Sequence, residues 1–103
     1  MAEKFIDVLG KRVILMDGAM ATELYDEGVF INMSYDALSL SKPELVEKVH
    51  RSYRKAGAEV LTTNTFGANR FRLMPFGKEA EVAAINAASV RVARKVAGQQ
   101  AWV

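Results

Sequence analysis

Two short polar segments stand directly after apolar runs, and their side chains are of the types that bind small polar ligands. The first, at residues 17–19, reads Asp-Gly-Ala and follows the apolar run at residues 13–16. The second, at residues 63–67, reads Thr-Asn-Thr-Phe-Gly. The carboxylate of Asp17 can accept hydrogen bonds from an ammonium group, and Gly18 lets a ligand approach the backbone. These residues predict a site for a small polar ligand.

The two segments come together only if the elements before them are neighbours. In an extended chain successive side chains point to opposite faces, so Thr63 and Thr65 share the side opposite Asn64. Neighbouring parallel strands lie about 4.8 Å apart, and ligands gather at their carboxyl ends. A second interpretation stays open from the residues alone, because Asp17 can simply cap a helix and threonines favour strands.

The hydrophobic pattern alternates between the helical and the extended type. Strands are predicted at residues 13–16 and 59–63, and residues 101–103 look like the opening of a third. Helices are predicted from the first residues to Gly10, over 19–26, from 43 to Gly57, over 70–74 and from 82 to Gly98. Ser41 and Glu44 predict a capping box for the third of these helices. Residues 29–40 are expected to form a long loop.

Alternating strands and helices predict an α/β fold, a parallel sheet with right-handed crossover helices. Two strands and the start of a third cannot close such a sheet or cover its edges. A complete (β/α)₈ barrel has about 250 residues, so this chain of 103 residues is expected to be the front part of something larger. The open sheet edges also predict self-association.

Composition excludes several classes of function. Fourteen Lys and Arg against 12 Asp and Glu give a net charge of +2, which predicts neither a nucleic-acid partner nor a membrane partner. The chain has no cysteine, which excludes disulfides and thiolate metal ligands within it. Its N-terminus lacks the apolar stretch of a signal peptide, so a cytoplasmic protein is expected. A Rossmann-like nucleotide binder is disfavoured because no G-x-G-x-x-G follows the first predicted strand.

Several segments, in the same order, resemble the homocysteine S-methyltransferase family. Residues 17–24, DGAMATEL, resemble the family signature DGAMGTEL, and residues 63–69 match its TNTFGAN block. Further matches are VHRSY at 49–53, AGA at 56–58, Ile85-Asn86 and residues 92–94. The loop at residues 30–32 is most similar to bacterial enzymes that join a homocysteine methyltransferase to a methylenetetrahydrofolate reductase. The homocysteine module of cobalamin-dependent methionine synthase is related to these enzymes.

The resemblance implies that residues 1–103 are a partial homocysteine-binding (β/α)₈ TIM-barrel domain, cut at the start of the third strand. It also implies a zinc-dependent enzyme that methylates the thiol of homocysteine to make methionine, with a folate-type methyl donor or cobalamin. Asp17 would contact the amino group of homocysteine, and Gly18 with Ala19 would line the amino-acid end. The remaining residues expected in this pocket are Thr63, Thr65 and Phe66.

Three departures from the family pattern limit what the resemblance implies. Ala21 replaces a glycine of the signature, and Ser39 stands where asparagine is common. The cysteines that hold zinc in the family are absent, and His50, the single histidine, is expected to pack within a helix or lie on its surface. No catalytic or metal-binding residue is therefore expected here, and the chain alone should be inactive. The alternative is a non-catalytic fragment protein that folds as an oligomer or with a partner.

Overall fold

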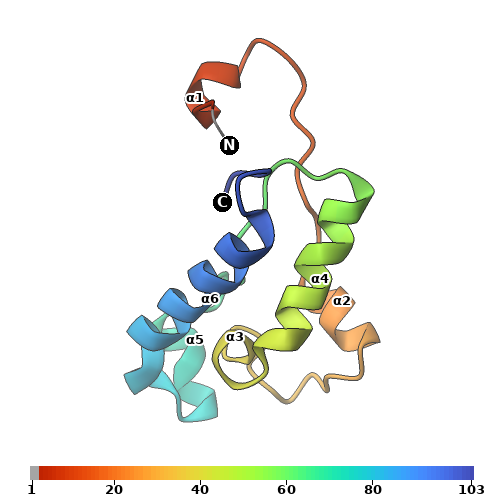
Figure 1. The fold of residues 1–103 in the computed structure, drawn as a ribbon. Coiled ribbons are helices and arrows are strands. Elements are labelled where there is room, and N and C mark those ends of the chain that lie inside the picture. The colour runs from red at the N-terminus through yellow and green to blue at the C-terminus, as the bar shows by residue number, and fades with distance from the viewer. Residues whose placement is uncertain (1–2) are drawn as a thin grey trace.

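The structure is a computed structural model that describes residues 3–103. Helices make up most of its regular structure (Figure 1). They are α1 (Phe5–Val8), α2 (Ala21–Asp26), α3 (Leu38–Ser41), α4 (Pro43–Ala56), α5 (Arg70–Leu73) and α6 (Val82–Ala97), with the 3₁₀ turns η1 (Met74–Phe76) and η2 (Glu79–Glu81).

Three extended segments run parallel to one another between these helices. Met16 pairs with Val60, and Val60 pairs with Trp102, each as a single parallel bridge. The backbone N–H of Glu59 donates to the carbonyl of Leu15 at 2.7 Å, and that of Trp102 donates to the carbonyl of Glu59 at 2.9 Å. The segment around residue 60 is therefore the middle one, as expected for successive βα units.

The prediction of regular strands is wrong over residues 3–103, because only these isolated bridges connect the segments. The first segment is paired along one edge, and its side chains are largely uncovered. Val13 is 91% exposed and Met16 53% exposed. A ladder with so few paired residues and no cover for its outer side does not extend into regular strands. The parallel order is observed, whereas the predicted α/β class and barrel remain expectations.

Helix α4 forms where the sequence predicts it, although its cap differs. Pro43 occupies the first turn, where its missing N–H costs little, and Gly57 ends the helix with φ 109°. The predicted capping box is wrong, because Lys42 is the N-cap residue and no side chain caps the helix. Ser41 instead ends α3, where its hydroxyl donates to the carbonyl of Ala37 at 3.2 Å. Residues 29–40, predicted as loop, include most of this short helix.

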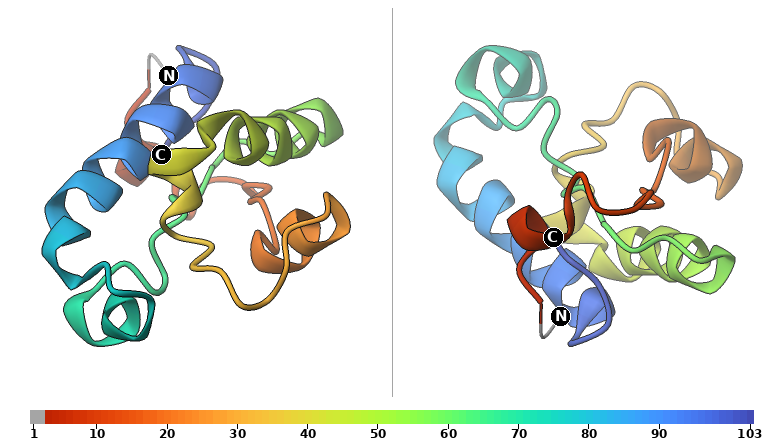
Figure 2. Two further views of the ribbon diagram at one scale, coloured as in Figure 1. Left: turned by 90° about the horizontal axis from the view of Figure 1, so that it is seen from below. Right: turned by 90° about the horizontal axis from the view of Figure 1, so that it is seen from above.

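The core lies where α4 and α6 pack over the extended segments and against α2 and α3 (Figures 1 and 2). Helix α6 forms within the range predicted for it, and its Ile85 and Ser89 side chains are fully buried. The largest cluster of buried side chains comprises Leu24, Val29, Leu38, Val46, Val49 and Val92. Burial of these groups from water provides the main stabilisation of the two long helices.

The N-terminal helix α1 packs against the C-terminal residues at one end of the molecule. Helix α1 lies near the C-terminal residues at one end, and α2, α3 and α5 lie toward the other (Figure 1). The Phe5 ring meets the edge of Trp102 with 5.7 Å between centroids, and the Trp102 indole N–H donates to the Glu3 carbonyl at 2.9 Å. None of the helices in residues 3–103 is long and apolar enough to cross a bilayer.

Candidate functional site

Asp17 is fixed to the middle extended segment at three points. Its backbone N–H donates to the carbonyl of Val60 at 3.1 Å. Its carboxylate accepts from the Thr62 N–H at Oδ2, 2.8 Å away, and from the Thr62 hydroxyl at Oδ1, 2.9 Å away. Within residues 3–103, no lysine or arginine forms an ion pair with this half-buried carboxylate. Neutral donors alone hold its charge.

Thr63 and Thr65 lie together, as the alternation of side chains predicts. Their hydroxyl oxygens are 2.8 Å apart and share one hydrogen bond. The N–H of Thr65 also donates to the carbonyl of Thr63 at 2.9 Å, which bends the chain sharply between them. Both residues are half-buried. The bend marks the point where the middle segment ends and the loop begins.

Asn64 points the other way and anchors this loop to two helices. Its side-chain amide donates to the carbonyl of Tyr35 at 2.8 Å and to the hydroxyl of Ser39 at 3.3 Å. The hydroxyl of Ser89 in α6 donates to the Asn64 carbonyl at 3.1 Å. Asn64, Ser39 and Ser89 are all buried, so these bonds satisfy polar groups that water cannot reach.

Asp36 holds the next part of the loop. Its Oδ1 accepts from the backbone N–H of Gly67 at 2.9 Å. A Cβ atom at position 67 would lie 2.7 Å from the Asp36 Oδ2, so glycine accommodates this close contact without a shift of the Asp36 side chain. The loop after the middle segment is thus attached to the chain that precedes α3.

A cavity of about 480 Å³ opens between these attached segments. This volume is in the range of small-molecule sites. The lining is mostly apolar, and Asp36 and Arg72 contribute one charge of each sign. The lining residues are Ala19, Met20, Ala21, Thr22, Ile31, Met33, Ser34, Tyr35, Asp36, Asn64, Phe66, Gly67, Arg72 and Phe76.

The six residues predicted from the sequence divide between this cavity and its border. Ala19 and Phe66 line it, and the Phe66 side chain is 94% exposed. The other four residues, Asp17, Gly18, Thr63 and Thr65, lie beside these lining segments in the chain. Gly18 fits against Tyr53, because a Cβ atom there would lie 3.1 Å from the tyrosine oxygen.

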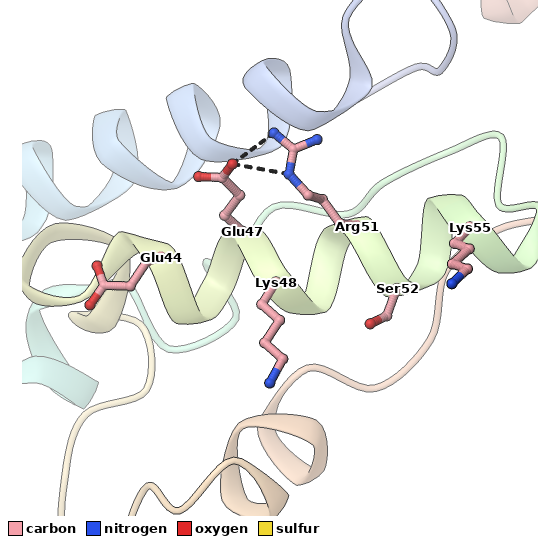
Figure 3. A pocket seen from close by; sticks show the side chains of 6 residues that line it. All are labelled: Glu44, Glu47, Lys48, Arg51, Ser52 and Lys55. Carbon is pink, nitrogen blue, oxygen red and sulfur yellow. Dashed lines mark hydrogen bonds and ion pairs between the residues drawn. The ribbon is translucent and has the colours of Figure 1, made fainter.

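A second hollow, of about 430 Å³, runs along the exposed side of α4 (Figure 3). Three of its charged groups, Glu47, Lys48 and Arg51, form ion pairs. Glu47 accepts from the Arg51 guanidinium at 2.7 Å and from the Lys95 ammonium at 3.0 Å. The Arg51 bond and then the Lys95 bond lower the pKa of Glu47. Since all its side chains come from one helix and do not converge, this hollow is a solvated helix surface. It is lined by Glu44, Glu47, Lys48, Arg51, Ser52 and Lys55.

Comparison with known proteins identifies the family. The family model for homocysteine S-methyltransferase matches residues 14–103. The chain belongs to the homocysteine S-methyltransferase family. It is 32% identical to methionine synthase from Mycobacterium tuberculosis and 30% identical to that from Mycobacterium leprae. Each alignment covers 91% of this chain and 8% of the relative.

A solved structure gives the same result. The metallated form of the homocysteine methyltransferase MmuM from Escherichia coli superposes with a TM-score of 0.75 at 36% identity. The match covers 87% of this chain and 33% of MmuM. The chain therefore spans about a third of the length of this homocysteine methyltransferase.

The residues present do not fit the zinc site implied by the family. The chain contains no cysteine, and residues 3–103 hold no group of three His, Cys, Asp or Glu that could bind a metal ion. His50 is fully buried in α4, and neither ring nitrogen has a hydrogen-bond partner within the described part of the chain. The surface alternative for His50 is wrong, and the packing alternative is confirmed.

The sequence did not single out Thr62 or Asp36 as residues of this candidate site. Thr62 is the first of three threonines around Asn64, and a partner for the neighbouring Asp17 could have been sought among all three. Asp36 lies in a region without a clear period. Its bond to Gly67 joins residues 31 positions apart, which no local pattern reveals.

Proposed function

We propose that this chain forms the first part of a zinc-dependent homocysteine S-methyltransferase and supplies part of its homocysteine pocket. In the proposed reaction, the homocysteine thiol loses its proton and the sulfur attacks the methyl carbon of a donor. A sulfur–carbon bond forms, the bond between methyl and donor breaks, and methionine is released. Thiolates rather than thiols are the nucleophiles in such reactions.

The charge on Asp17 is the observation that carries this proposal. Its carboxylate accepts two hydrogen bonds from Thr62 and has no ion-pair partner within residues 3–103. A carboxylate has about four acceptor sites, so two are left for other donors. An ammonium group supplies both the missing positive charge and further donors. We infer that Asp17 binds the amino group of homocysteine.

The remaining pocket residues follow from their neighbourhood. In this proposal, Gly18 and Ala19 line the amino-acid end of homocysteine, and Thr63 and Thr65 contribute hydroxyl groups. The largely exposed ring of Phe66 contributes apolar surface at the cavity rim. The α/β barrel and the domain assignment of residues 1–103 belong to the same proposal, which the parallel pairing of three segments supports.

Zinc, the methyl donor and the rest of the barrel lie outside what these residues supply. Because catalytic zinc needs about three protein ligands, we expect the 103-residue chain alone to be inactive. A folate-type donor or cobalamin remains the proposed source of the methyl group. A cytoplasmic location is also part of the proposal, since a reducing compartment keeps the thiol of homocysteine available.

Replacing Asp17 with asparagine in the enzyme that carries this segment tests the proposal. We expect the Kd for homocysteine to rise roughly ten- to a hundredfold, as the loss of a charge-assisted hydrogen bond predicts. Bound zinc, measured by atomic absorption, should not change. An unchanged homocysteine Kd would restrict Asp17 to a structural role and refute the proposed pocket.

A non-catalytic fragment protein is the second candidate, and exposed apolar side chains support it. Val13, Leu15 and Met16 are 91%, 52% and 53% exposed, which leaves an uncovered surface that another chain could pair with. Sedimentation of the 103-residue chain tests this candidate. It predicts a dimer or larger species at micromolar concentration, and a monomer at every concentration would remove self-association.

A further inference from the structure

Thr62 is the one residue of the described chain that binds both carboxylate oxygens of Asp17. We propose that Thr62 is a positioning residue, which fixes the orientation of the Asp17 carboxylate for the ammonium group of the substrate. This inference rests on the proposed function of Asp17 and adds a residue outside the set predicted from the sequence.

The geometry of the pair sets the orientation of the whole carboxyl group. The Thr62 N–H donates to the Asp17 Oδ2 at 2.8 Å, and the Thr62 hydroxyl donates to Oδ1 at 2.9 Å. A single hydrogen bond would leave the carboxyl group free to rotate about its bond to Cβ, whereas two bonds to different oxygens prevent this. The backbone of Asp17 is also fixed, by the bond from its N–H to Val60. Both the position and the rotation of the group are thus determined before a ligand arrives.

The chemistry of the donors preserves the charge that the ligand needs. A lysine or arginine in the place of Thr62 would orient the carboxylate equally well but would also neutralise it. The hydroxyl and N–H of Thr62 carry no net charge, so Asp17 keeps its attraction for an ammonium group. Preorganisation of this kind strengthens binding because less freedom is lost when the ligand arrives.

Two substitutions separate the hydroxyl of Thr62 from its shape. Thr62→Val has nearly the same volume and keeps the backbone N–H, but it cannot donate to Oδ1. Thr62→Ser keeps the hydroxyl. In the full enzyme, we expect Thr62→Val to raise the homocysteine Kd about three- to tenfold and Thr62→Ser to stay within about twofold. Ser52→Ala, on the exposed side of α4, is the matched control for removing a hydroxyl group.

A merely structural role for Thr62 would give a different pattern. The second ligand in the experiment is des-amino homocysteine, the butyrate with a terminal thiol, which lacks the ammonium group. If Thr62 acts through Asp17, Thr62→Val weakens homocysteine and leaves des-amino homocysteine within about twofold. In the Asp17→Asn background, Thr62→Val should then have no further effect on the homocysteine Kd. Thermal unfolding of each variant confirms that the fold is retained.

Each other outcome overturns the inference in an identifiable way. Equal weakening of both ligands by Thr62→Val assigns Thr62 to general stability of the pocket. Additive effects of Thr62→Val and Asp17→Asn show that the two residues act independently. An unchanged homocysteine Kd in Thr62→Val, with a large effect of Asp17→Asn, refutes the positioning role alone. No effect of Asp17→Asn refutes the proposed function as well.

Discussion

The first and middle extended segments are joined by a carboxylate at each end, and the two joints differ in charge. At the amino end, Glu59 accepts from the Leu15 N–H at 3.3 Å and forms a two-point ion pair with Arg12, at 3.0 and 2.7 Å. At the carboxyl end, Asp17 accepts from the N–H and hydroxyl of Thr62. Both carboxylates link neighbouring backbones, but of these two only Glu59 forms an ion pair with a side chain of residues 3–103.

This difference shows how similar hydrogen-bond geometry can serve two purposes. The Arg12 bond, followed by the bond from the Leu15 N–H, lowers the pKa of Glu59, and the same ion pair raises the pKa of Arg12. Glu59 is thus already satisfied and has little to offer a ligand. Asp17 is oriented equally firmly while its charge remains available. We interpret Glu59 as a residue that only stabilises the fold, and Asp17 as a residue that can also bind a ligand.

The largest effect on homocysteine binding is expected when Asp17, like Glu59, is given a positively charged partner. Thr62→Lys places an ammonium group beside Asp17, which would neutralise the carboxylate and repel the ammonium group of homocysteine. We expect the homocysteine Kd in the full enzyme to rise about a hundredfold or more. Isothermal titration calorimetry measures this value directly.

Thr62→Met is the control for that substitution, because it removes the hydroxyl and adds a long side chain without charge. Thr62→Met should reduce homocysteine affinity only by the smaller amount expected for the missing hydroxyl. If Thr62→Lys and Thr62→Met weaken homocysteine to the same extent, the free charge of Asp17 does not distinguish the two ends.

His50 offers an intermediate effect, on stability rather than on binding. Burial lowers its pKa from the ordinary 6.5, and the charge of Asp17 partly opposes this shift. A group with a lowered folded-state pKa stabilises the fold fully above its unfolded pKa, and this stability is lost as the pH falls below that value and through the folded-state pKa. The free energy of unfolding should therefore decrease between pH about 7.5 and about 5.5.

Urea denaturation of the wild type and of His50→Leu over this pH range measures the effect. The variant removes the titrating group and the two unpaired ring nitrogens, so its stability should be nearly independent of pH in this window. Glutamate residues with lowered pKa values, such as Glu59, titrate at more acidic pH. The same pH dependence in His50→Leu would assign the effect to another group.

The smallest effect on stability and on homocysteine binding is expected from a substitution of Glu59. Glu59→Gln makes the same chemical change as Asp17→Asn and keeps an oxygen to accept from Leu15. Exposed ion pairs contribute little to stability, so we expect a small decrease in the melting temperature and a homocysteine Kd within about twofold of the wild type. A large loss of homocysteine binding in Glu59→Gln would remove the distinction between the two ends.

Local sequence patterns predicted α1, α2, α4, α5 and α6, but they did not predict α3, which lies mostly in the predicted loop. Pro43 and Gly57 mark the ends of α4, and α6 forms within the range predicted for it. The capping box failed because Ser41 was already part of α3. Whether Ser41 ends α3 or caps α4 depends on tertiary contacts, and a local sequence motif carries no information about these contacts.

The sequence predicted that the two polar segments are neighbours, but it did not predict their hydrogen-bond partners. Apolar runs ending in Asp17 and in the threonines indicated that the two polar segments meet, and the Asp17–Thr62 bonds agree with this placement. The choice of Thr62 over Thr63 depends on the register between two segments 45 residues apart. The regular strands were overpredicted because apolar runs report β propensity and not whether a neighbour is present to complete the ladder.

The most direct test of the account compares homocysteine with des-amino homocysteine in wild-type and Asp17→Asn enzyme. If Asp17 binds the ammonium group, the substitution should raise the Kd for homocysteine roughly ten- to a hundredfold. The Kd for des-amino homocysteine, which has no ammonium group, should change by less than about twofold. An equal loss for both ligands, or no loss for either, would contradict the assignment of Asp17 as the residue that binds the amino group of homocysteine.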